Sequence, residues 1–355
     1  MCNKESLTIR KQSMNSVHWL VVLDTIWDFN PHPPIETITS SDLASTRLRL
    51  GTLLKSNKLK QLEVSFGSLI KNNPAIIMIG KPAFLKGDIL EDLWLSQIIK
   101  NKKTYGSKII LDYTDDHLNN ISSTSNFYYQ YLPYIDAAVT SSLYLKKALR
   151  KHFQGHIEII TDPIEVPINK PQCKTNETVS ILWFGHASNI AYLEDIVSQW
   201  KDLKAKLILN ILTNEDGMII FKKNQTSIPK NLSINIMQWS LDAMINTAKF
   251  CNLCIIPSDP NDLKKAGVSS NRLITALALG LPTAADDLNA YNEFKDYFID
   301  IRSEEFDSLL SHPNNYNHMV TKVQQRIIPN FTQDKIGVEW VKFFSSLSLN
   351  LKDNK

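Results

Sequence analysis

The sequence predicts an α/β protein built from two doubly wound domains that face a cleft. Apolar runs of strand length alternate with longer amphipathic stretches, and the alternation starts again after residues 161–178, which are rich in proline and polar residues. The chain has 355 residues, which is long for one domain and sufficient for two. We therefore divide it into a flexible lead-in (1–16), a first domain (17–165), a linker (166–178), a second domain (179–331) and a C-terminal helix with its tail (332–355).

The first domain contains continuous apolar runs, the pattern of parallel strands that are covered on both faces. The predicted strands are 18–24, 75–80, 108–113, 137–141 and 157–160. The first strand ends at Asp24, and the long loop that follows it contains Asp28; loops of this kind are usually functional or mobile. Helices are predicted at 41–55, which includes Arg47 and Arg49, at 88–100 and at 143–151.

The second domain repeats this alternation. Its predicted strands are 179–184, 207–212, 233–239, 253–257 and 282–285. Its predicted helices are 189–201, 240–249, 273–279, 304–310, 316–327 and 333–349. The last helix carries its apolar residues on one stripe, which indicates that this face is buried: Ile336, Trp340, Phe343, Phe344 and Leu347.

Composition and motifs exclude several classes of protein. The formal net charge of +3 is too small to argue for a nucleic-acid partner. No G-x-G-x-x-G follows a strand, which disfavours a dinucleotide dehydrogenase, and no P-loop motif is present. Cys251 and Cys254 form a C-x-x-C without a second pair or a nearby histidine, so we expect buried thiols and no metal site.

The sequence favours a cytoplasmic protein. No apolar run approaches the roughly 18–20 residues that span a bilayer, and the first residues lack the apolar core of a secretion signal. Basic clusters in the first domain can meet an anionic lipid surface at the inner face of the membrane, although solvated helix ends explain each cluster singly. These clusters contain Lys55, Lys58, Lys60, Lys100, Lys102, Lys103, Lys146, Lys147, Arg150 and Lys151.

The most specific chemistry is predicted for residues 264–285. A polar loop leads into an apolar helix that stops at Gly280, and Ser269 or Ser270 can cap the start of this helix. The free N–H groups and the positive end of the helix dipole favour an anion at this point. Three cationic side chains can donate to a phosphate: Lys264, Lys265 and Arg272. An ordinary capped helix with solvated lysines is the alternative.

This segment, with lysines in a polar loop, then Ser-x-Asn-Arg and a helix that ends in Gly-Leu-Pro-Thr, resembles the donor-binding segment of GT-B glycosyltransferases, which have two Rossmann-like domains. The resemblance implies a nucleotide-sugar donor held by its phosphate, no metal ion or other cofactor, and a C-terminal helix that crosses back to the first domain. Many retaining members have two glutamates flanking this loop. Gly267 and Thr275 stand at those positions here, so the sequence leaves retention or inversion open.

The resemblance also implies that the turn after the strand 179–184 lies against the donor phosphates. This turn exposes backbone N–H groups, Ser188 or Asn189 can cap the next helix, and His186 can contact donor or acceptor or be an ordinary surface residue. Trp239 offers a flat face to the nucleotide base, or it fills the core. The predicted donor-binding residues are Gly185, His186, Ser188, Asn189, Trp239, Lys264, Lys265, Ser269, Ser270, Asn271 and Arg272.

The predicted acceptor site lies in the first domain. Asp115, Asp116 and His117 follow a strand and can orient or deprotonate a sugar hydroxyl, or an aspartate can cap the next helix. By resemblance, an acceptor contacts Asp28, Arg47 and Arg49, although surface arginines on a helix are equally compatible with the sequence. The predicted catalytic residues are Asp115, Asp116, His117 and Arg272, and an inverting enzyme would take its base from Asp24, Asp28, Asp115, Asp116 or His117.

The resulting hypothesis is a glycosyltransferase that moves a sugar from a nucleotide-activated donor to a cell-surface glycan or a lipid-linked acceptor. Electrostatic stabilisation of the departing nucleotide phosphate would supply the largest catalytic effect. Two alternatives stay open: a non-catalytic GT-B-like subunit that binds glycan or nucleotide, and a nucleotide-sugar epimerase on the same scaffold.

Overall fold

The computed structural model describes residues 15–21, 34–41, 44–51, 54–81, 89–119, 123–171, 178–202, 205–224, 228–262, 265 and 267–349. Most of the predicted lead-in, together with Asp24, Asp28 and Lys264, lies outside the described residues. The chain divides into two compact units. Unit 1 contains Met1–Thr140, Leu149–Ile160 and Gly337–Lys355, and unit 2 contains Ser141–Ala148 and Thr161–Ile336.

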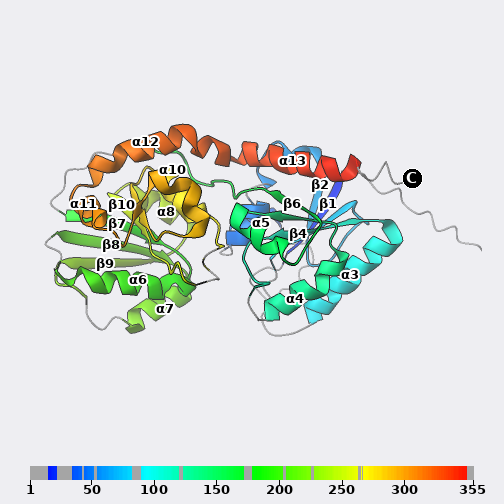
Figure 1. Ribbon diagram of the computed structural model, residues 1–355, viewed down its shortest axis with the longest axis horizontal. Coiled ribbons are helices and arrows are strands. Elements are labelled where there is room, and N and C mark those ends of the chain that lie inside the picture. Colours follow the sequence, from blue (N-terminus) through cyan, green and yellow to red (C-terminus); the bar gives the residue numbers. More distant parts are fainter. Residues whose placement is uncertain are drawn as a thin grey trace, which may run out of the picture. The chain divides into compact units, whose positions relative to one another are not determined.

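Unit 1 is built on a six-stranded parallel sheet with the order β2-β1-β3-β4-β5-β6 (Figure 1). The central strands are buried along their length, which explains why they are continuous apolar runs in the sequence. The strands are β1 (Ser16–Leu20), β2 (Glu63–Gly67), β3 (Ile76–Ile79), β4 (Lys108–Tyr113), β5 (Ala137–Thr140) and β6 (His156–Ile159).

The helices among the described residues of the N-terminal half are α1 (Ile35–Thr39), a π-helix (Ser45–Gly51), α3 (Ile89–Tyr105), α4 (Ser123–Tyr131) and α5 (Leu143–Arg150), with short 3-10 helices at Leu59–Gln61 and Leu132–Tyr134. The π-helix stands where the sequence predicts a longer helix with Arg47 and Arg49. None of the helices in the described part of the chain combines the length and the apolar character that a membrane-spanning helix requires.

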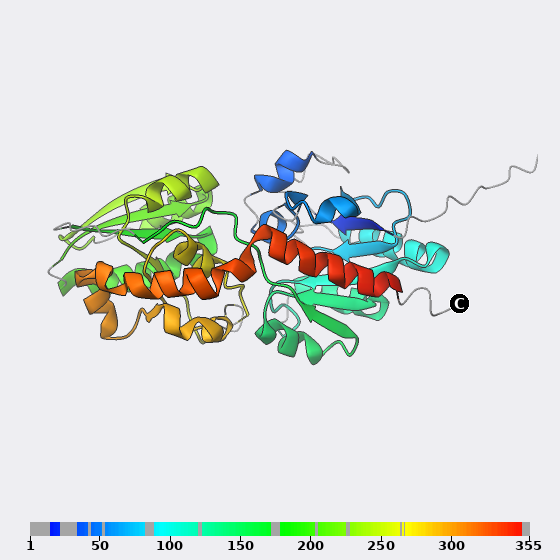
Figure 2. The same ribbon diagram turned by 90° about the horizontal axis from the view of Figure 1, so that it is seen from above.

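The C-terminal helix α13 (Gln333–Leu349) has the predicted bounds, and from Gly337 onward it belongs to unit 1. Figures 1 and 2 show it lying along one face of that unit's sheet. Trp340 is fully buried and meets Trp19 of β1 edge-on, with the ring centroids 5.2 Å apart. A Cβ on Gly337 would come within 2.5 Å of Ser56 Oγ, so glycine is what allows the helix to approach this closely. The predicted apolar stripe is therefore confirmed as a packing face.

Unit 2 has a second six-stranded parallel sheet, in the order β12-β11-β10-β7-β8-β9. Its strands are β7 (Thr178–Phe184), β8 (Lys206–Thr213), β9 (Leu232–Gln238), β10 (Leu253–Ile256), β11 (Thr283–Ala285) and β12 (Ile299–Asp300). Its helices are α6 (Ile190–Ser198), α7 (Glu215–Asn224), α8 (Leu241–Ala248), α10 (Asn271–Ala278), α11 (Glu305–Ser311) and α12 (Asn317–Arg326), with 3-10 helices at Ala187–Asn189, Gln199–Asp202, Asn289–Tyr297, Pro313–Tyr316 and Ile328–Phe331.

Helices cover both faces of this sheet, so unit 2 has two cores. One core packs α8, α10 and α12 against the sheet, and the other packs α6 and α11 against the opposite face (Figure 1). Helix α10 ends as predicted, because Gly280 adopts a φ of 86°, in the left-handed region that favours glycine. The doubly wound α/β architecture predicted from the sequence is confirmed in both units.

Candidate functional site

The strand order of unit 2 reverses between β7 and β10. The chain runs from β7 outward through β8 to β9, then returns to place β10 on the other side of β7. In open α/β sheets, ligands bind in the crevice beyond the carboxyl ends of the strands at such a switch point. The turn that begins at Gly185 follows β7, and the segment that leads into α10 follows β10. Most of the predicted donor-binding residues belong to the two segments that follow these strands: Gly185, His186, Ser188, Asn189, Lys265, Ser269, Ser270, Asn271 and Arg272.

Arg272 in the first turn of α10 reaches the Gly185 turn. Its Nη1 atom lies 3.3 Å from the position that a Cβ on Gly185 would occupy. This nitrogen is buried and has no hydrogen-bond partner among the described residues. A buried guanidinium N–H without an acceptor is costly, because the donor has lost water without gaining a replacement. The geometry therefore offers a place for an anionic oxygen beside Gly185.

Two weakly acidic side chains, Cys254 and Tyr291, lie near Arg272. Burial raises the pKa of the Cys254 thiol and of the Tyr291 hydroxyl, and in each case the nearby Arg272 cation offsets part of this rise. The Tyr291 hydroxyl is also buried, and no described residue hydrogen-bonds to it. Both thiol and phenol are neutral at physiological pH when their pKa is raised, so neither neutralises the guanidinium. As expected from the sequence, the C-x-x-C thiols Cys251 and Cys254 are buried.

The start of α10 is capped by one of the two predicted serines. Ser269 Oγ accepts a hydrogen bond from the backbone N–H of Asn271 at 3.2 Å. Ser270 occupies the N-cap position, but its side chain makes no capping hydrogen bond. The cap thus comes from Ser269 and not from Ser270. The side chains of Ser269, Ser270 and Asn271 are half-buried.

The turn after β7 is held by side chains from neighbouring segments. The backbone N–H of Ala187 donates to Asn214 Oδ1 at 2.9 Å, and Nδ1 of the exposed His186 accepts from the Ser188 N–H at 3.3 Å. Asn189 is buried, and its Oδ1 accepts a hydrogen bond of 2.7 Å from Lys265 Nζ. This hydrogen bond connects Lys265 to the turn after β7. Both were predicted to bind the donor.

Trp239, predicted to receive a nucleotide base, is half-buried at the end of β9. Its backbone N–H donates to Thr213 O at 2.7 Å, and its ring packs against the core beneath α8 and α10. The core-filling alternative therefore describes part of this ring. Trp239 follows β9 at the same edge of the sheet as the Gly185 turn, because both follow the carboxyl ends of parallel strands.

In unit 1, the predicted acceptor residues separate into two kinds. Asp115 Oδ2 forms an ion pair with Lys81, which follows β3, and lies 3.8 Å from His117 Nε2. All three side chains are partly exposed at the carboxyl edge of the sheet. Asp116 is instead buried: its Oδ1 accepts from the Tyr113 hydroxyl at 3.0 Å and from Asn119 Nδ2 at 2.7 Å. Asp116 therefore fastens the loop, and its role as a base stays a prediction.

Arg47 and Arg49 are buried and do not face solvent. Arg47 Nη1 donates to Ser41 O at 2.7 Å. Arg49 forms a forked ion pair with Asp112 of β4, with Nη2 at 2.6 Å from Oδ1, and its Nη1 donates to Ile160 O at 2.7 Å. Their burial contradicts the interpretation as solvated surface arginines, and the acceptor contact stays a prediction. Asp28, the third predicted acceptor residue, lies outside the described residues.

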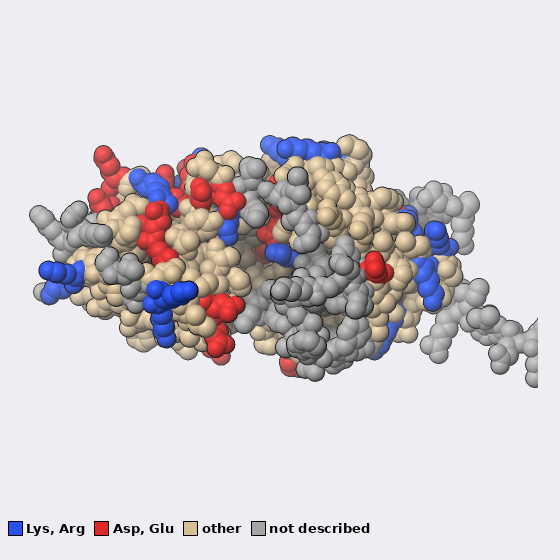
Figure 3. Space-filling model, turned by 90° about the horizontal axis from the view of Figure 1, so that it is seen from below, with Lys and Arg blue, Asp and Glu red and all other residues tan. Residues whose placement is uncertain are grey.

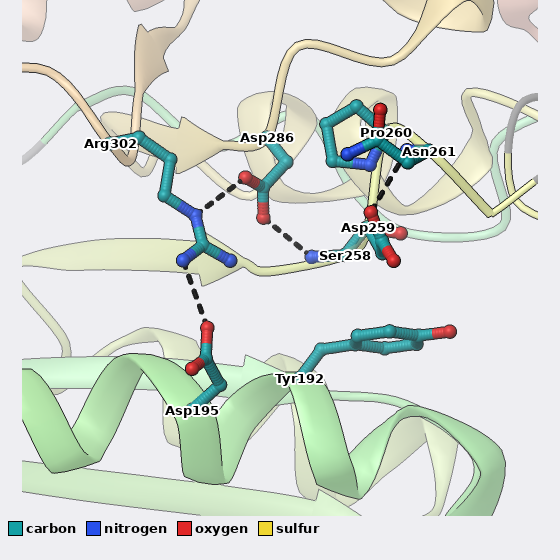
Figure 4. A pocket seen from close by; sticks show the side chains of 8 residues that line it. All are labelled: Tyr192, Asp195, Ser258, Asp259, Pro260, Asn261, Asp286 and Arg302. Atoms are coloured by element: carbon teal, nitrogen blue, oxygen red, sulfur yellow. Dashed lines mark hydrogen bonds and ion pairs between the residues drawn. The ribbon is translucent and has the colours of Figure 1, made fainter.

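A second feature of unit 2 was not predicted. A cavity of about 510 Å³ opens at the carboxyl ends of β10, β11 and β12, beside α6 (Figure 4). Residues 258–261 line it after β10, Asp286 after β11 and Arg302 after β12, while Tyr192 and Asp195 face it from α6. The sequence does contain a signal for this cavity, because a polar residue follows each of these three strands. The cavity could not be predicted from it, since the sequence does not show that these strands are neighbours in the sheet.

The guanidinium of Arg302 bridges two carboxylates of this cavity, those of Asp286 and Asp195. Its Nε donates to Asp286 Oδ1 and its Nη1 donates to Asp195 Oδ2, both at 2.9 Å. The other oxygen of Asp286 accepts from the Ser258 backbone N–H at 2.7 Å. Burial raises the pKa of Asp286 despite these hydrogen bonds, which act in the opposite direction. Asp286 is therefore a buried carboxylate whose ionised form depends on Arg302.

Replacing Arg302 by methionine is expected to raise the pKa of Asp286 further, because the substitution removes both the hydrogen bond and the positive charge that favour the carboxylate. A carboxyl whose pKa is raised in the folded state binds its proton more tightly there. Its contribution to stability therefore increases as pH falls between the folded and the ordinary pKa. A ¹³C NMR titration of the aspartate carboxyl carbons measures the pKa, denaturation at several pH values measures the stability, and an unchanged Asp286 titration in the variant would contradict the expected rise in pKa.

No family model and no curated protein match the chain. Solved structures do. A glycosyltransferase from Rickettsia africae ESF-5 matches with 12% identity and a TM-score of 0.58, covering 93% of this chain and 98% of that one. An alpha-glucosyltransferase in complex with UDP matches with 9% identity and a TM-score of 0.56, covering 93% and 99%. TarM matches with a TM-score of 0.52 and 12% identity, and this chain spans 54% of its length.

Likeness at these identities shows the fold. The chain has the GT-B glycosyltransferase fold, as the resemblance of residues 264–282 implies. The two parallel six-stranded sheets with helices on their faces are the features that these structures share with it.

Proposed function

We propose that the chain is a glycosyltransferase that moves a sugar from a nucleotide-activated donor to a glycan or lipid-linked acceptor. One observation carries the proposal: the buried Nη1 of Arg272 has no partner in the described part of unit 2 and lies beside the Gly185 turn, at the switch point of the sheet. A phosphate oxygen would supply the missing acceptor, and a charge-assisted hydrogen bond of this kind is among the strong ones. The GT-B fold and the complex of one structural neighbour with UDP support this assignment.

In the proposed reaction, the acceptor oxygen forms a bond to the anomeric carbon while the bond from that carbon to the phosphate oxygen breaks. The departing phosphate gains negative charge, which Arg272 and the backbone N–H groups at the Gly185 turn stabilise. Lys265 acts indirectly, since its ammonium holds Asn189 and thereby the turn. The proposed site uses these fixed donors to neutralise the phosphate, and we expect transfer to proceed in the presence of a chelator.

The acceptor hydroxyl must lose its proton during the reaction. If the enzyme inverts, Asp115 with His117 is the pair best suited to accept this proton, since both side chains are partly exposed and 3.8 Å apart. Asp116 is less suited, because both of its oxygens already accept hydrogen bonds from Asn119. If the enzyme retains, no such base is required.

A lipid-linked acceptor would place the protein at the cytoplasmic face of a membrane. Figure 3 shows Lys and Arg side chains gathered toward the edge of the molecule at which Figure 1 places α3. Lys100 and Lys103 near the end of α3 are exposed, whereas Lys102 pairs with Asp136 at 2.7 Å. This basic edge supports an electrostatic contact with anionic lipid. Lys102 contributes little to that contact, because its charge is paired with Asp136.

A panel of nucleotide sugars tests the function. We expect the full-length protein to bind UDP or another nucleoside diphosphate in calorimetric titrations, and to release that nucleotide slowly from one sugar donor in the presence of EDTA. Because donor hydrolysis by water needs no acceptor, the assay works before the acceptor is identified. A folded protein that binds no nucleoside diphosphate and hydrolyses no donor would overturn the proposal.

A non-catalytic GT-B-like subunit is the second candidate, and one observation favours it. The two positions that carry glutamates in many retaining members hold Gly267 and Thr275, both of which are buried. Neither residue supplies a carboxylate to a donor. A protein that binds nucleotide without hydrolysing any donor would support this candidate over the transferase and the epimerase.

A further inference from the structure

The cavity at the carboxyl ends of β10, β11 and β12 shares no lining residue with the predicted donor site. Its volume of about 510 Å³ lies in the range of pockets that hold small molecules. Ser258, which helps to line it, is buried, and its hydroxyl has no hydrogen-bond partner within the described residues. A cavity of this size with an unsatisfied hydroxyl in its wall is a candidate binding site.

We propose that this cavity binds a neutral, polyhydroxylated ligand, that is, the uncharged ring of a sugar. Its polar lining offers hydrogen-bond acceptors, namely the carboxylates of Asp195 and Asp259 and the amide oxygen of Asn261, whereas both oxygens of Asp286 already accept from Arg302 and Ser258. A sugar ring presents many O–H donors, and hydrogen bonds from them to carboxylates are charge-assisted. The ring of Tyr192 and Pro260 add apolar surface for the C–H faces of such a ligand.

The arrangement of the charged side chains makes this lining selective. In Figure 4, Arg302 lies between Asp286 and Asp195, and its remaining nitrogen points into the cavity, where it can donate to a ligand oxygen. Asp259 Oδ1 accepts from the backbone N–H of Asn261 at 2.9 Å, which fixes the loop and leaves the other carboxylate oxygen for a ligand. The cavity therefore offers fixed acceptors on one side and a fixed donor on another.

The same arrangement disfavours the two competing kinds of ligand. Three carboxylates face one guanidinium, so a phosphate would meet net negative charge. A divalent cation needs several carboxylates converging on one point, but Arg302 separates Asp286 from Asp195. Among the described residues, no group of three His, Cys, Asp or Glu side chains is placed to hold a metal ion. A neutral sugar ring is compatible with this cavity, because it carries no negative charge to be repelled and needs no converging carboxylates.

A neutral ring can reach the cavity from two sources, a glycan chain or the sugar of a nucleotide donor. Tyr192 connects the cavity to the proposed phosphate site, because Lys265 Nζ lies 5.4 Å from the centre of its ring and also donates to Asn189. The inference does not require that the protein transfers sugar. The two sources are separated by testing neutral oligosaccharides and nucleotide sugars side by side.

Saturation-transfer NMR on the full-length protein tests the inference. The probes are glucose, galactose, N-acetylglucosamine, their short neutral oligosaccharides, their 1-phosphates and the matching UDP-sugars. We expect one neutral sugar to bind, and Asp259→Asn and Asn261→Ala to weaken it about tenfold each, as for loss of a hydrogen bond to a charged or amide group. The matched control is Asp287→Asn, because Asp287 is exposed, follows Asp286 directly and does not line the cavity.

Arg272→Ala distinguishes this inference from the proposed function. Loss of UDP binding in that variant with sugar binding retained supports a cavity that acts independently and receives a glycan. Neutral sugar binding that is lost together with UDP binding would overturn the separate site. Binding that is indifferent to the cavity variants, tighter binding of sugar phosphates than of neutral sugars, displacement by Mg²⁺ or Ca²⁺, or no binding of any neutral sugar would also overturn it.

Discussion

Replacing Arg49 by alanine is expected to lower the free energy of unfolding by about 3–5 kcal/mol, the usual cost of breaking a buried ion pair from one side. Arg49 and Asp112 are each only 1% exposed. The substitution would leave the Asp112 carboxylate buried in β4 without the three hydrogen bonds that Arg49 Nε and Nη2 donate to it. It would also free Ile160 O and remove the cation that lies 5.1 Å from the centre of the Trp340 ring.

Urea denaturation measures this loss, with Lys103→Ala as the control, since Lys103 is an exposed lysine whose removal should cost less than about 0.5 kcal/mol. The double variant Arg49→Met with Asp112→Asn should lose less stability than the sum of the losses in the two single variants. The reason is that it leaves no uncompensated buried charge. A loss below about 1 kcal/mol in Arg49→Ala would show that Asp112 finds another partner or water.

The location of this ion pair explains why we expect indirect effects on the acceptor side. Asp112 lies in β4, which ends at Tyr113, just before Asp115 and His117. Arg49 links β4 to the chain after β6 and to α13 through Trp340. It is therefore a positioning residue for the carboxyl edge of the unit 1 sheet.

The central strands and two of the edge strands, β6 and β9, were predicted from the sequence, whereas the edge strands β2 and β12 were not. Residues 108–113 form β4 with the predicted bounds, because a strand covered on both faces must be apolar throughout. β2 lies at the edge of its sheet and reads Glu-Val-Ser-Phe-Gly, which lacks a continuous apolar run. β12 has two residues, too few for any periodic signal. Edge strands need fewer apolar residues, so their sequences are less informative.

The sequence also does not reveal which charged residues pair with each other in the fold. The charge of Asp112 within an otherwise apolar strand was a signal that a buried partner must exist, since an isolated buried carboxylate is costly. The partner, Arg49, lies 63 residues away, and no local pattern identifies it. Arg272, in contrast, was found through the motif that surrounds it. What the motif could not disclose is that its Nη1 would be buried with no acceptor from the described residues.

Arg272→Ala is expected to have the largest effect on function. Removing one donor from a site that stabilises a developing negative charge typically lowers kcat by about 10²–10³-fold. We expect this loss in the donor-hydrolysis assay, with a parallel weakening of UDP binding. Arg272→Lys should recover part of both, because lysine retains the charge but not the planar fork of donors. Arg326→Ala is the matched control, an exposed arginine of α12 in the same unit.

The stability of Arg272→Ala should distinguish it from Arg49→Ala. Arg49 donates to Asp112 and Ile160, so its loss leaves buried acceptors unsatisfied. The buried Nη1 of Arg272 donates to none of the described residues, so its removal should leave the free energy of unfolding unchanged or raised. UDP should raise the melting temperature of the native protein and not that of Arg272→Ala, because a ligand stabilises only the state that binds it. An Arg272→Ala protein that is destabilised by several kcal/mol, or that UDP still stabilises fully, would show that this guanidinium serves the fold and not the donor.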